Sequence, residues 1–325
     1  MMVAMPPSSI PTVDLSAPDA AAQIVDAYST VGFAYLVNHG VDPELLAALF
    51  DASRQFHASS AVDKQTIALD ELHRGFIAIN TSTDRNSTLA EVTKPNQSES
   101  FMLMRDDALD SQHVQAGRYL AGPNQWPEWM PDFQPVMQRY HDTMIVVGMR
   151  LVELIAKGLD APVEELAANF EPPTTWLRLL HYPPRPPAAP DDLYGSAPHC
   201  DFGFVTILAQ DNTGGLQVQS VEGEWLDVPP VEGAFVMNVG DMLHRWSNGR
   251  LRSTPHRVIN RSGAERYSCP FFFDPFVGTV ITPLASCVGA DGPLFAPTDF
   301  GQFLRNELEA SYDQHDPTLH DAFTD

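Results

Sequence analysis

The spacing of apolar residues divides the chain into a first part with helical patterns and a second part rich in short strands. In the stretch 131–158, Met137, Met144, Val147 and Leu151 recur near a period of 3.6 residues, which predicts the longest helix of the chain. The same reading predicts further helices at 20–28, 42–58 and 298–312, and short strands at 10–15, 33–37 and 100–104.

The predicted helix at 42–58 carries a start signal of its own. Asp42 is a residue type that accepts hydrogen bonds from the first N–H groups of a helix, and Pro43 suits the first helical position because it has no N–H to satisfy.

After Pro173 the pattern changes to short runs of β-branched and aromatic residues, separated by turns with Gly, Pro and Asn. The runs are TWLRLLHY, FVTILAQD, GLQVQS, EWLDVP, AFVMNVG, HRVINR and YSCPFFFD. Several short strands at this spacing indicate an antiparallel sandwich or barrel. We therefore expect a helical N-terminal portion packed on a C-terminal β core, with the chemistry in the core.

The length of 325 residues fits one large domain or two fused lobes. The net charge is −23, from 19 basic and 42 acidic residues. Such a surface repels nucleic-acid backbones and anionic lipid, so neither partner is expected. An anionic ligand would need a local basic pocket, which makes each arginine near a site informative.

The cysteines, the first residues and the length of the apolar runs indicate where in the cell the protein is expected. The three cysteines are an odd, sparse set without a C-x-x-C pair, which favours the reducing cytoplasm over a disulfide framework. The start MMVAMPPSSIP lacks the basic and apolar regions of a secretory signal, and no apolar run approaches the ~18 residues of a membrane span. The sequence does not indicate the oligomeric state.

A candidate metal site begins with His199, Cys200 and Asp201, at the start of one β run. On a strand, residues i and i+2 share a face, so His199 and Asp201 are expected to point the same way and Cys200 away. His256, in a later β run, is the best third ligand. Two histidines and one carboxylate leave open positions on an octahedral ion, the arrangement of non-haem Fe(II) oxygenases.

Other interpretations of these histidines stay open at this point. The same ligand types also bind catalytic zinc, although no H-E-x-x-H helix is present. His244 competes with His256 for the third position. A lone histidine such as His39, His73 or His141 is more often a satisfied core or surface residue.

A candidate anion site follows ten residues after His256. By strand alternation, Arg266 and Ser268 share one face with Pro270, Phe272 and Asp274. An arginine on the inner face of a β core is costly unless an anion pairs with it. Its planar fork suits a carboxylate, and the serine hydroxyl adds a further donor. An exposed edge-strand arginine is the alternative.

The whole pattern resembles the 2-oxoglutarate/Fe(II)-dependent dioxygenase superfamily, in its isopenicillin N synthase-like branch. The resemblance extends from about Ile10 to Tyr312. It is carried by HCDFGFVTILAQDNTGGLQV, GEWLDVPPVEGAFVMNVGDMLHRWSNGRLRSTPHRVIN and RYSCPFFFDP, with LHYPP and VGFAYLVNHGV upstream.

The resemblance implies a fold that is mainly β with flanking helices (α+β), with a double-stranded β-helix (jelly-roll) core and a helical N-terminal portion. We expect an N-terminal region over 1–130, a long scaffold helix over 131–170, the core over 171–285, and a C-terminal helix with an acidic tail over 286–325.

The resemblance also implies roles for individual residues. These are iron ligation by His199, Asp201 and His256, and 2-oxoglutarate binding by Arg266 and Ser268 with help from Tyr182. Arg178 and Leu180 share the strand face of Tyr182 and are candidates for the substrate pocket, as is Phe272. Relatives often carry asparagine at the position of Leu180, so a polar pocket residue is lost here.

The implied enzyme couples oxidative decarboxylation of 2-oxoglutarate, to succinate and CO2, to hydroxylation or another C–H oxidation of a small molecule, with Fe(II) and O2. It needs no general acid or base. The alternatives are an Fe(II)/O2 oxidase that does not use 2-oxoglutarate and a non-catalytic binding protein. A nucleobase, an amino-acid derivative, a plant-hormone-like acid and a secondary-metabolite intermediate all remain open as substrates.

Overall fold

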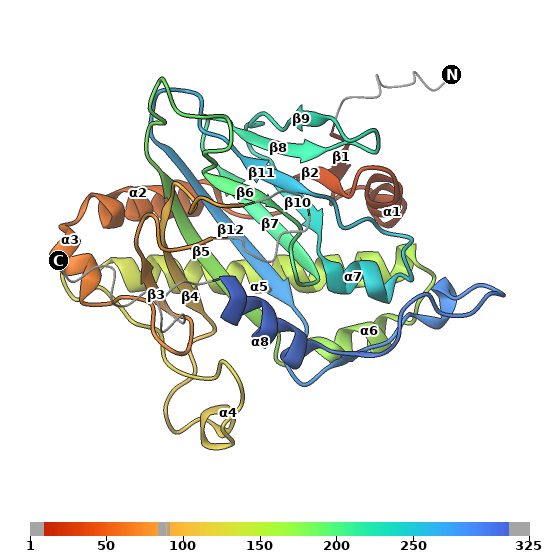
Figure 1. Ribbon diagram of the computed structural model, residues 1–325. Helices are drawn as coiled ribbons and strands as arrows, with labels where there is room; N and C mark the ends of the chain where they lie inside the picture. Colours follow the sequence, from red (N-terminus) through yellow and green to blue (C-terminus); the bar gives the residue numbers. More distant parts are fainter. Residues whose placement is uncertain (1–9, 84–88, 90–91, 312–325) are drawn as a thin grey trace.

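Two facing β-sheets form the centre of the computed structural model, which describes residues 10–83, 89 and 92–311 (Figure 1). The major sheet has eight strands in the order β1-β2-β10-β7-β12-β5-β4-β3, and the minor sheet has four in the order β6-β11-β8-β9. From β5 to β12 the chain passes back and forth between the sheets, and neighbours within each sheet pair antiparallel except β1 beside β2. This is the double-stranded β-helix that the sequence predicted.

The bounds of the elements follow. The major sheet contains β1 (Thr12–Asp14), β2 (Phe33–Val37), β3 (Gly75–Ile77), β4 (Glu99–Met104), β5 (Thr174–Tyr182), β7 (Val205–Gln210), β10 (Phe235–Val239) and β12 (Arg266–Asp274). The minor sheet contains β6 (Ser196–His199), β8 (Leu216–Gln219), β9 (Trp225–Asp227) and β11 (His256–Val258), and β13 (Val280–Ile281) pairs with β14 (Thr298–Asp299). The helices are α1 (Ala20–Thr30), α2 (Pro43–Ala58), α3 (Ala61–Gln65), α4 (Gln112–Gln115), α5 (Phe133–Gly158), α6 (Val163–Ala167), α7 (Asp241–Trp246) and α8 (Phe300–Ser311), with 3-10 turns at Ala168–Phe170 and Ala285–Cys287.

Helices α1, α2 and α5 cover one face of the major sheet, and the minor sheet lies against the other (Figure 1). The buried side of α5 includes Met137, Met144 and Leu151, as its period predicted. Gly148 lets this helix approach the sheet, because a Cβ there would lie 2.5 Å from the ring of Phe273.

The helix boundaries predicted from apolar spacing agree with the structure to within two residues. The scaffold helix expected over 131–170 does not: α5 ends at Gly158, because Asp160 adopts a positive φ, and a separate short helix follows. Asp42 caps α2, since its carboxylate accepts a hydrogen bond from the Glu44 N–H, and Pro43 is the first helical residue. At the C-terminal end, Thr298 is not helical, because it pairs with Ile281 in a short ribbon before α8 begins. Tyr312 lies outside the described residues.

The N-terminal portion contains the expected helices and short strands, and its strands join the core sheet. β1 to β4 all join the major sheet, and β2 pairs with β10 in a register that sets Phe33 opposite Asn238. The physical reason is that a sheet edge with unpaired N–H and C=O groups is a liability, and these N-terminal strands extend the core sheet at both edges.

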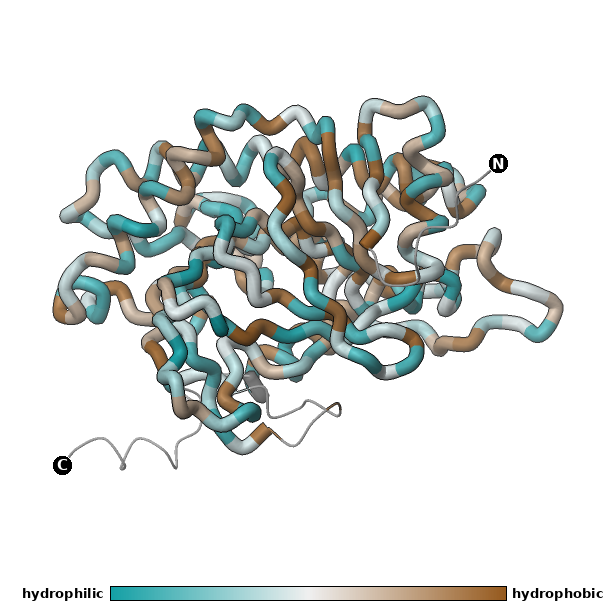
Figure 2. Tube along the Cα trace, turned by 90° about the horizontal axis from the view of Figure 1, so that it is seen from above, coloured by the Kyte–Doolittle hydropathy of each residue, from teal (hydrophilic) through white to brown (hydrophobic). Residues whose placement is uncertain are grey.

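Strand alternation sorts the side chains of β12 between the two faces. Cys269, Phe271 and Phe273 are fully buried against the helices. A second apolar cluster between the sheets includes Tyr182 and Val258. Seen from above, the hydrophobic stretches are concentrated in the interior of the molecule (Figure 2).

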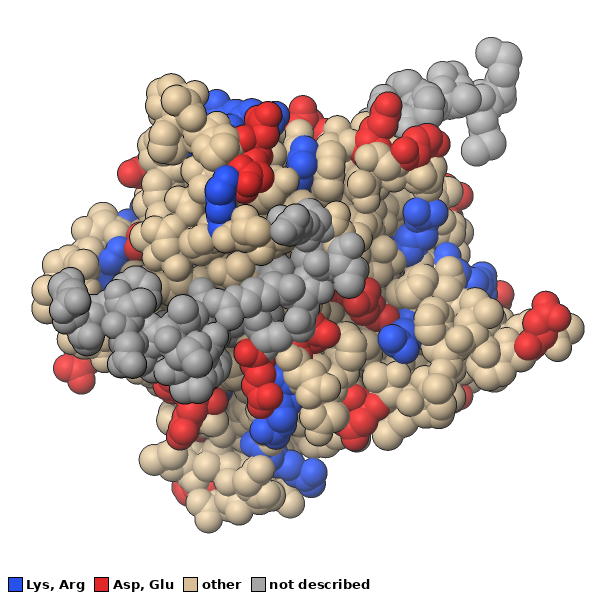
Figure 3. Space-filling model, viewed as in Figure 1, with Lys and Arg blue, Asp and Glu red and all other residues tan. Residues whose placement is uncertain are grey.

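The surface reflects the acidic composition. On the face shown in Figure 3, Lys and Arg atoms occur in small separate groups among Asp and Glu. Within the part of the chain that the structure describes, no helix is both long and apolar enough to cross a bilayer.

Candidate active site

Three side chains predicted as metal ligands converge at one end of the space between the sheets. His199 and His256 are directly opposite each other in the pairing of β6 with β11, with ring centroids 4.3 Å apart. The Nε2 atom of each ring lies 3.6 Å from Oδ1 of Asp201. The three ligand atoms therefore form a compact group that a single metal ion could bridge.

The reason that the sequence offered for this convergence is wrong in one respect. β6 ends at His199, so Asp201 lies beyond the strand and does not share a strand face with it. Cys200 was expected to point away but lines the cavity beside these residues. The alternation rule fails here because the strand ends at His199 and the chain bends from Phe202 onward. Burial raises the pKa of Cys200 to about 12, so its thiol stays protonated.

Asp201 is oriented by two buried polar residues that the sequence reading missed. Its Oδ2 accepts hydrogen bonds from the Thr206 hydroxyl and from the Asn238 amide, the latter at 2.7 Å. Oδ1 is thereby left facing the two imidazoles. A polar residue in the apolar runs FVTIL and FVMNV was the available signal.

The histidines are oriented in the way that metal ligands are. Nδ1 of His199 lies 2.7 Å from the carbonyl of Ala197, and Nδ1 of His256 lies 3.3 Å from that of Thr254. A carbonyl only accepts, so Nδ1 carries the proton in both rings and Nε2 is left as the metal-binding atom.

The charge of Asp201 suits the same role. Burial opposes ionisation, but His256 and His199 nearby, with the hydrogen bonds from Asn238 and Thr206, lower the pKa of Asp201. The donor set of two imidazoles and one carboxylate fits Fe(II).

The other histidines are placed elsewhere. His244 lies in α7, where Nδ1 is 2.6 Å from the carbonyl of Leu251, and it is not in the convergent group. His141 Nε2 lies 2.8 Å from the Thr175 hydroxyl, and His39 contacts the carbonyl of Gly233. His73 is buried.

Arg266 lies inside the protein with none of its surface exposed. Its Nε donates to the carbonyl of Gly214 at 2.7 Å and its Nη1 to the Ser268 hydroxyl at 3.1 Å, while the guanidinium stacks 4.6 Å from the ring centroid of Tyr182. Among the described residues, no carboxylate pairs with this buried cation. Arg266, Ser268 and Tyr182 are thus brought together, as the sequence predicted.

A cavity opens beside the three convergent residues. Arg178 and Phe272 line it, and Leu180 does not, because it packs in the apolar cluster between the sheets. The lining also includes Leu308 of α8, which no motif had indicated. The remaining lining residues are Ser82, Asn96, Met102, Trp176, Ser196, Phe202, Gly203 and Asp274.

Asp274 closes one side of this cavity. Its Oδ1 accepts from the Phe204 N–H at 2.6 Å and its Oδ2 from the Trp176 indole at 3.0 Å. Burial raises the pKa of Asp274 to about 7, against these two hydrogen bonds. A Cβ at Gly203 would lie 1.7 Å from Oδ1, so this close approach requires glycine.

Comparison with known proteins agrees with this geometry. The family model described as 2OG-Fe(II) oxygenase superfamily matches residues 173–275, and the model described as non-haem dioxygenase in morphine synthesis N-terminal matches residues 10–129. The 2-oxoglutarate-Fe(II) type oxidoreductase hxnY of Emericella nidulans is 34% identical, over 95% of this chain and 92% of its own length.

This chain belongs to the 2OG-Fe(II) oxygenase superfamily.

Other relatives of this oxygenase support the assignment. The 2-oxoglutarate-dependent dioxygenase citB of Monascus ruber is 35% identical, over 85% of this chain and 87% of its own. The crystal structure of a full-length Neurospora crassa protein in complex with alpha-KG and thymine superposes with a TM-score of 0.82 at 25% identity, over 95% of this chain and 98% of that one. JOX2 in complex with 2OG, Fe and JA superposes with a TM-score of 0.77 at 29% identity, over 91% and 84% of the two chains.

The oxygenase therefore uses Fe(II), 2-oxoglutarate and O2 to oxidise a small molecule. The predictions of family, fold, reaction class and cofactors are confirmed.

Proposed function

We propose that His199, Asp201 and His256 hold the ferrous ion. The support is the geometry of these residues: Nε2 of both rings lies 3.6 Å from a carboxylate oxygen, and both Nδ1 atoms are tied to backbone carbonyls. Two imidazoles and one carboxylate leave positions open for a chelating cosubstrate and O2. When bound, the iron supplies activation of O2 and couples decarboxylation of 2-oxoglutarate to C–H oxidation.

Arg266 and Ser268 bind the distal carboxylate of 2-oxoglutarate in this proposal, with Tyr182 packed against the guanidinium. The observation that carries the proposal is that Arg266 is fully buried and has no carboxylate partner in the described part of the chain. Burial of a cation without a counter-charge costs roughly several kcal/mol of folding free energy, and a bound anion offsets this cost. The net charge of −23 makes such a local site necessary for any anionic cosubstrate.

The substrate occupies the cavity beside the iron ligands. Phe272 and Trp176 offer flat apolar surface, with their rings in edge contact at 6.0 Å. Arg178 donates from Nε to the Ser100 hydroxyl at 2.9 Å, and its other two guanidinium nitrogens have no partner among the described residues. A small ring compound with a carboxylate or carbonyl oxygen fits this lining.

The protein positions the metal ion and the two substrates rather than supplying acid–base groups. Asp201 stays ionised, Thr206 and Asn238 fix its orientation, and Cys200 stays protonated. No side chain at this site is needed as a general base.

The experiment follows turnover of 2-oxoglutarate that is radiolabelled at the carboxyl carbon released as CO2. The protein is reconstituted anaerobically with Fe(II) and then exposed to O2, with a panel of ring acids and their uncharged analogues. We expect succinate and labelled CO2 in equal amounts, stimulated by the substrate. R178M should lose the stimulation but keep the slow turnover without substrate. Failure of both wild type and R178M to decarboxylate 2-oxoglutarate contradicts the proposal.

A further inference from the structure

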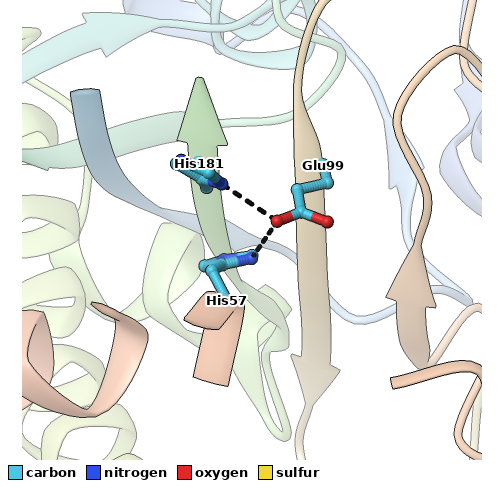
Figure 4. Close-up of side chains that lie close together, drawn as sticks. All are labelled: His57, Glu99 and His181. Atoms are coloured by element: carbon cyan, nitrogen blue, oxygen red, sulfur yellow. Dashed lines mark hydrogen bonds and ion pairs between the residues drawn. The ribbon is translucent and has the colours of Figure 1, made fainter. Parts of the chain in front are cut away.

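A second group of side chains that could bind a metal ion is drawn in Figure 4. It lies on the face of the major sheet that α2 covers, whereas Tyr182 of strand β5 faces the space between the sheets. His57 is near the end of α2, Glu99 begins β4, and His181 lies in β5 directly opposite Glu99. One nitrogen of each ring and one carboxylate oxygen lie within 4.8 Å of one another. Nδ1 of His57 is 3.3 Å and Nδ1 of His181 is 2.9 Å from Glu99 Oε1. These separations are shorter than the 3.6 Å at the iron ligands.

Both ring nitrogens of His57 face oxygen atoms. Its Nε2 lies 3.2 Å from the carbonyl of Leu179 and its Nδ1 faces the carboxylate, so both neighbours only accept hydrogen bonds. In its neutral form the ring can therefore satisfy only one of these two oxygens. A neutral imidazole carries a single N–H, and one nitrogen must therefore direct its lone pair at an oxygen.

His181 likewise has one ring nitrogen without a hydrogen bond. Its Nδ1 lies 2.9 Å from Oε1 of Glu99, while its buried Nε2 has no hydrogen-bond partner within the described residues. The nearest acceptor, Oε1 of Glu265, is 3.9 Å from Nε2. His57 Nδ1 is the matching atom without a hydrogen bond on the other ring.

A bound metal ion would satisfy the ring nitrogens of both His57 and His181. With both Nδ1 lone pairs on the ion, each ring carries its proton on Nε2, and those N–H groups point at the Leu179 carbonyl and toward Glu265. Outer acceptors of this kind are what fix metal-ligating histidines in other proteins. Oε1 of Glu99 lies 2.9 Å from Nδ1 of His181 and 3.3 Å from Nδ1 of His57, so one carboxylate oxygen faces both rings, as it does when all three residues bind one ion.

We propose that His57, Glu99 and His181 form a second metal site, for a divalent ion of the zinc type. Two imidazole nitrogens and one carboxylate oxygen are a common zinc donor set, with bonds of ~2.0–2.2 Å. The ion joins the end of α2 to β4 and β5. It is a structural metal, because the site lies behind the sheet that carries Tyr182 and Arg178 on its other face.

Lys64 is the competitor of this ion. Its Nζ lies 2.8 Å from Oε2 and 3.1 Å from Oε1 of Glu99, and it donates to the carbonyl of His57 at 3.0 Å. When a metal ion binds Oε1 of Glu99, the Lys64 ammonium keeps only its hydrogen bond to Oε2. The charges of Glu99 and Glu265 offset those of the ion, whereas Lys64 opposes it, so removal of the ammonium should tighten metal binding.

The test is equilibrium dialysis of the full chain against Co2+ or Zn2+, with metal content measured by elemental analysis. Wild type should bind two equivalents and D201A one. H57Q in the D201A background should bind none, while H39N, which removes a half-buried histidine elsewhere, should leave one. Zn2+ should raise the melting temperature of D201A and not that of D201A/H57Q.

A second variant keeps the test decisive if H57Q does not fold. K64M in the D201A background should lower the dissociation constant for the remaining ion. The proposal is overturned if D201A binds no metal, if the equivalent survives H57Q, or if K64M weakens binding. In those cases the group is an ion-pair cluster between α2 and the sheet.

Discussion

At the scale of single residues, the proposed iron site depends on how Asp201 is oriented. Thr206 and Asn238 occupy Oδ2 and leave Oδ1 toward the imidazoles. T206V removes one of these donors at nearly constant volume. Loss of such an outer contact typically weakens metal binding by about 10- to 100-fold, and we expect that range for Fe(II) in an anaerobic titration. T213V, on a half-buried threonine outside the site, should leave Fe(II) affinity unchanged.

Arg266 provides a second prediction at this scale. R266K keeps the positive charge but loses the planar fork that can meet a carboxylate with two N–H groups. A hydrogen bond to a charged group is worth about 1.5–3 kcal/mol, so the KM for 2-oxoglutarate should rise by roughly 10- to 150-fold. Steady-state kinetics at saturating Fe(II) measure it. An unchanged KM would place the cosubstrate elsewhere.

The sequence indicated the principal residues of the proposed site but not the residues that position them. The order of His199, Asp201, His256 and Arg266 along the chain indicated a site directly. Thr206 and Asn238 come from two other strands, and their role depends on a register that spacing alone does not determine.

At the scale of elements, the close contact between α5 and the sheet can be tested at Gly148. A Cβ there would lie 2.5 Å from the ring of Phe273. Overpacking of this kind typically costs about 1–3 kcal/mol, so G148A should lower the free energy of unfolding by that amount in urea denaturation. G289A is the control, because nothing lies within 4 Å of its added Cβ.

The cluster that joins α2, α3, β4 and β5 makes stability depend on pH. The pKa of Glu99 is lowered in the folded protein, so its stabilisation is present above the unfolded value of 4.5 and is lost as the pH falls below it. The charged or titratable groups that face it are Lys64, His57 and His181. E99Q should therefore be less stable than wild type at pH 7, and the difference should shrink below about pH 4.5.

Chemical denaturation across this pH range, in the presence of a chelator, measures the difference. A constant gap between E99Q and wild type would mean that Glu99 has an ordinary pKa in the folded state.

Element types were predictable where a periodic pattern was long, as in α2 and α5. The exception near the site is instructive: alternation was extended from His199 to Cys200 and Asp201, but the strand had already ended. Strand ends are set by pairing with β11, which is a long-range contact and leaves no local signal.

At the scale of the whole molecule, the β core was predicted from its short, turn-separated runs. The joining of β1 to β4 with the C-terminal strands was not, because β2 pairs with a strand about two hundred residues later. Leu308 was missed for the same reason, because α8 is far along the chain from the other elements that line the cavity.

The most direct measurement of the central claim compares Fe(II)-dependent succinate formation from 2-oxoglutarate in wild type, H256A and H244A. We expect H256A to lose succinate formation and Fe(II) binding together, while H244A, in a helix outside the convergent group, keeps both. Full succinate formation by H256A, or its loss in H244A with the fold intact, would contradict the proposed iron site.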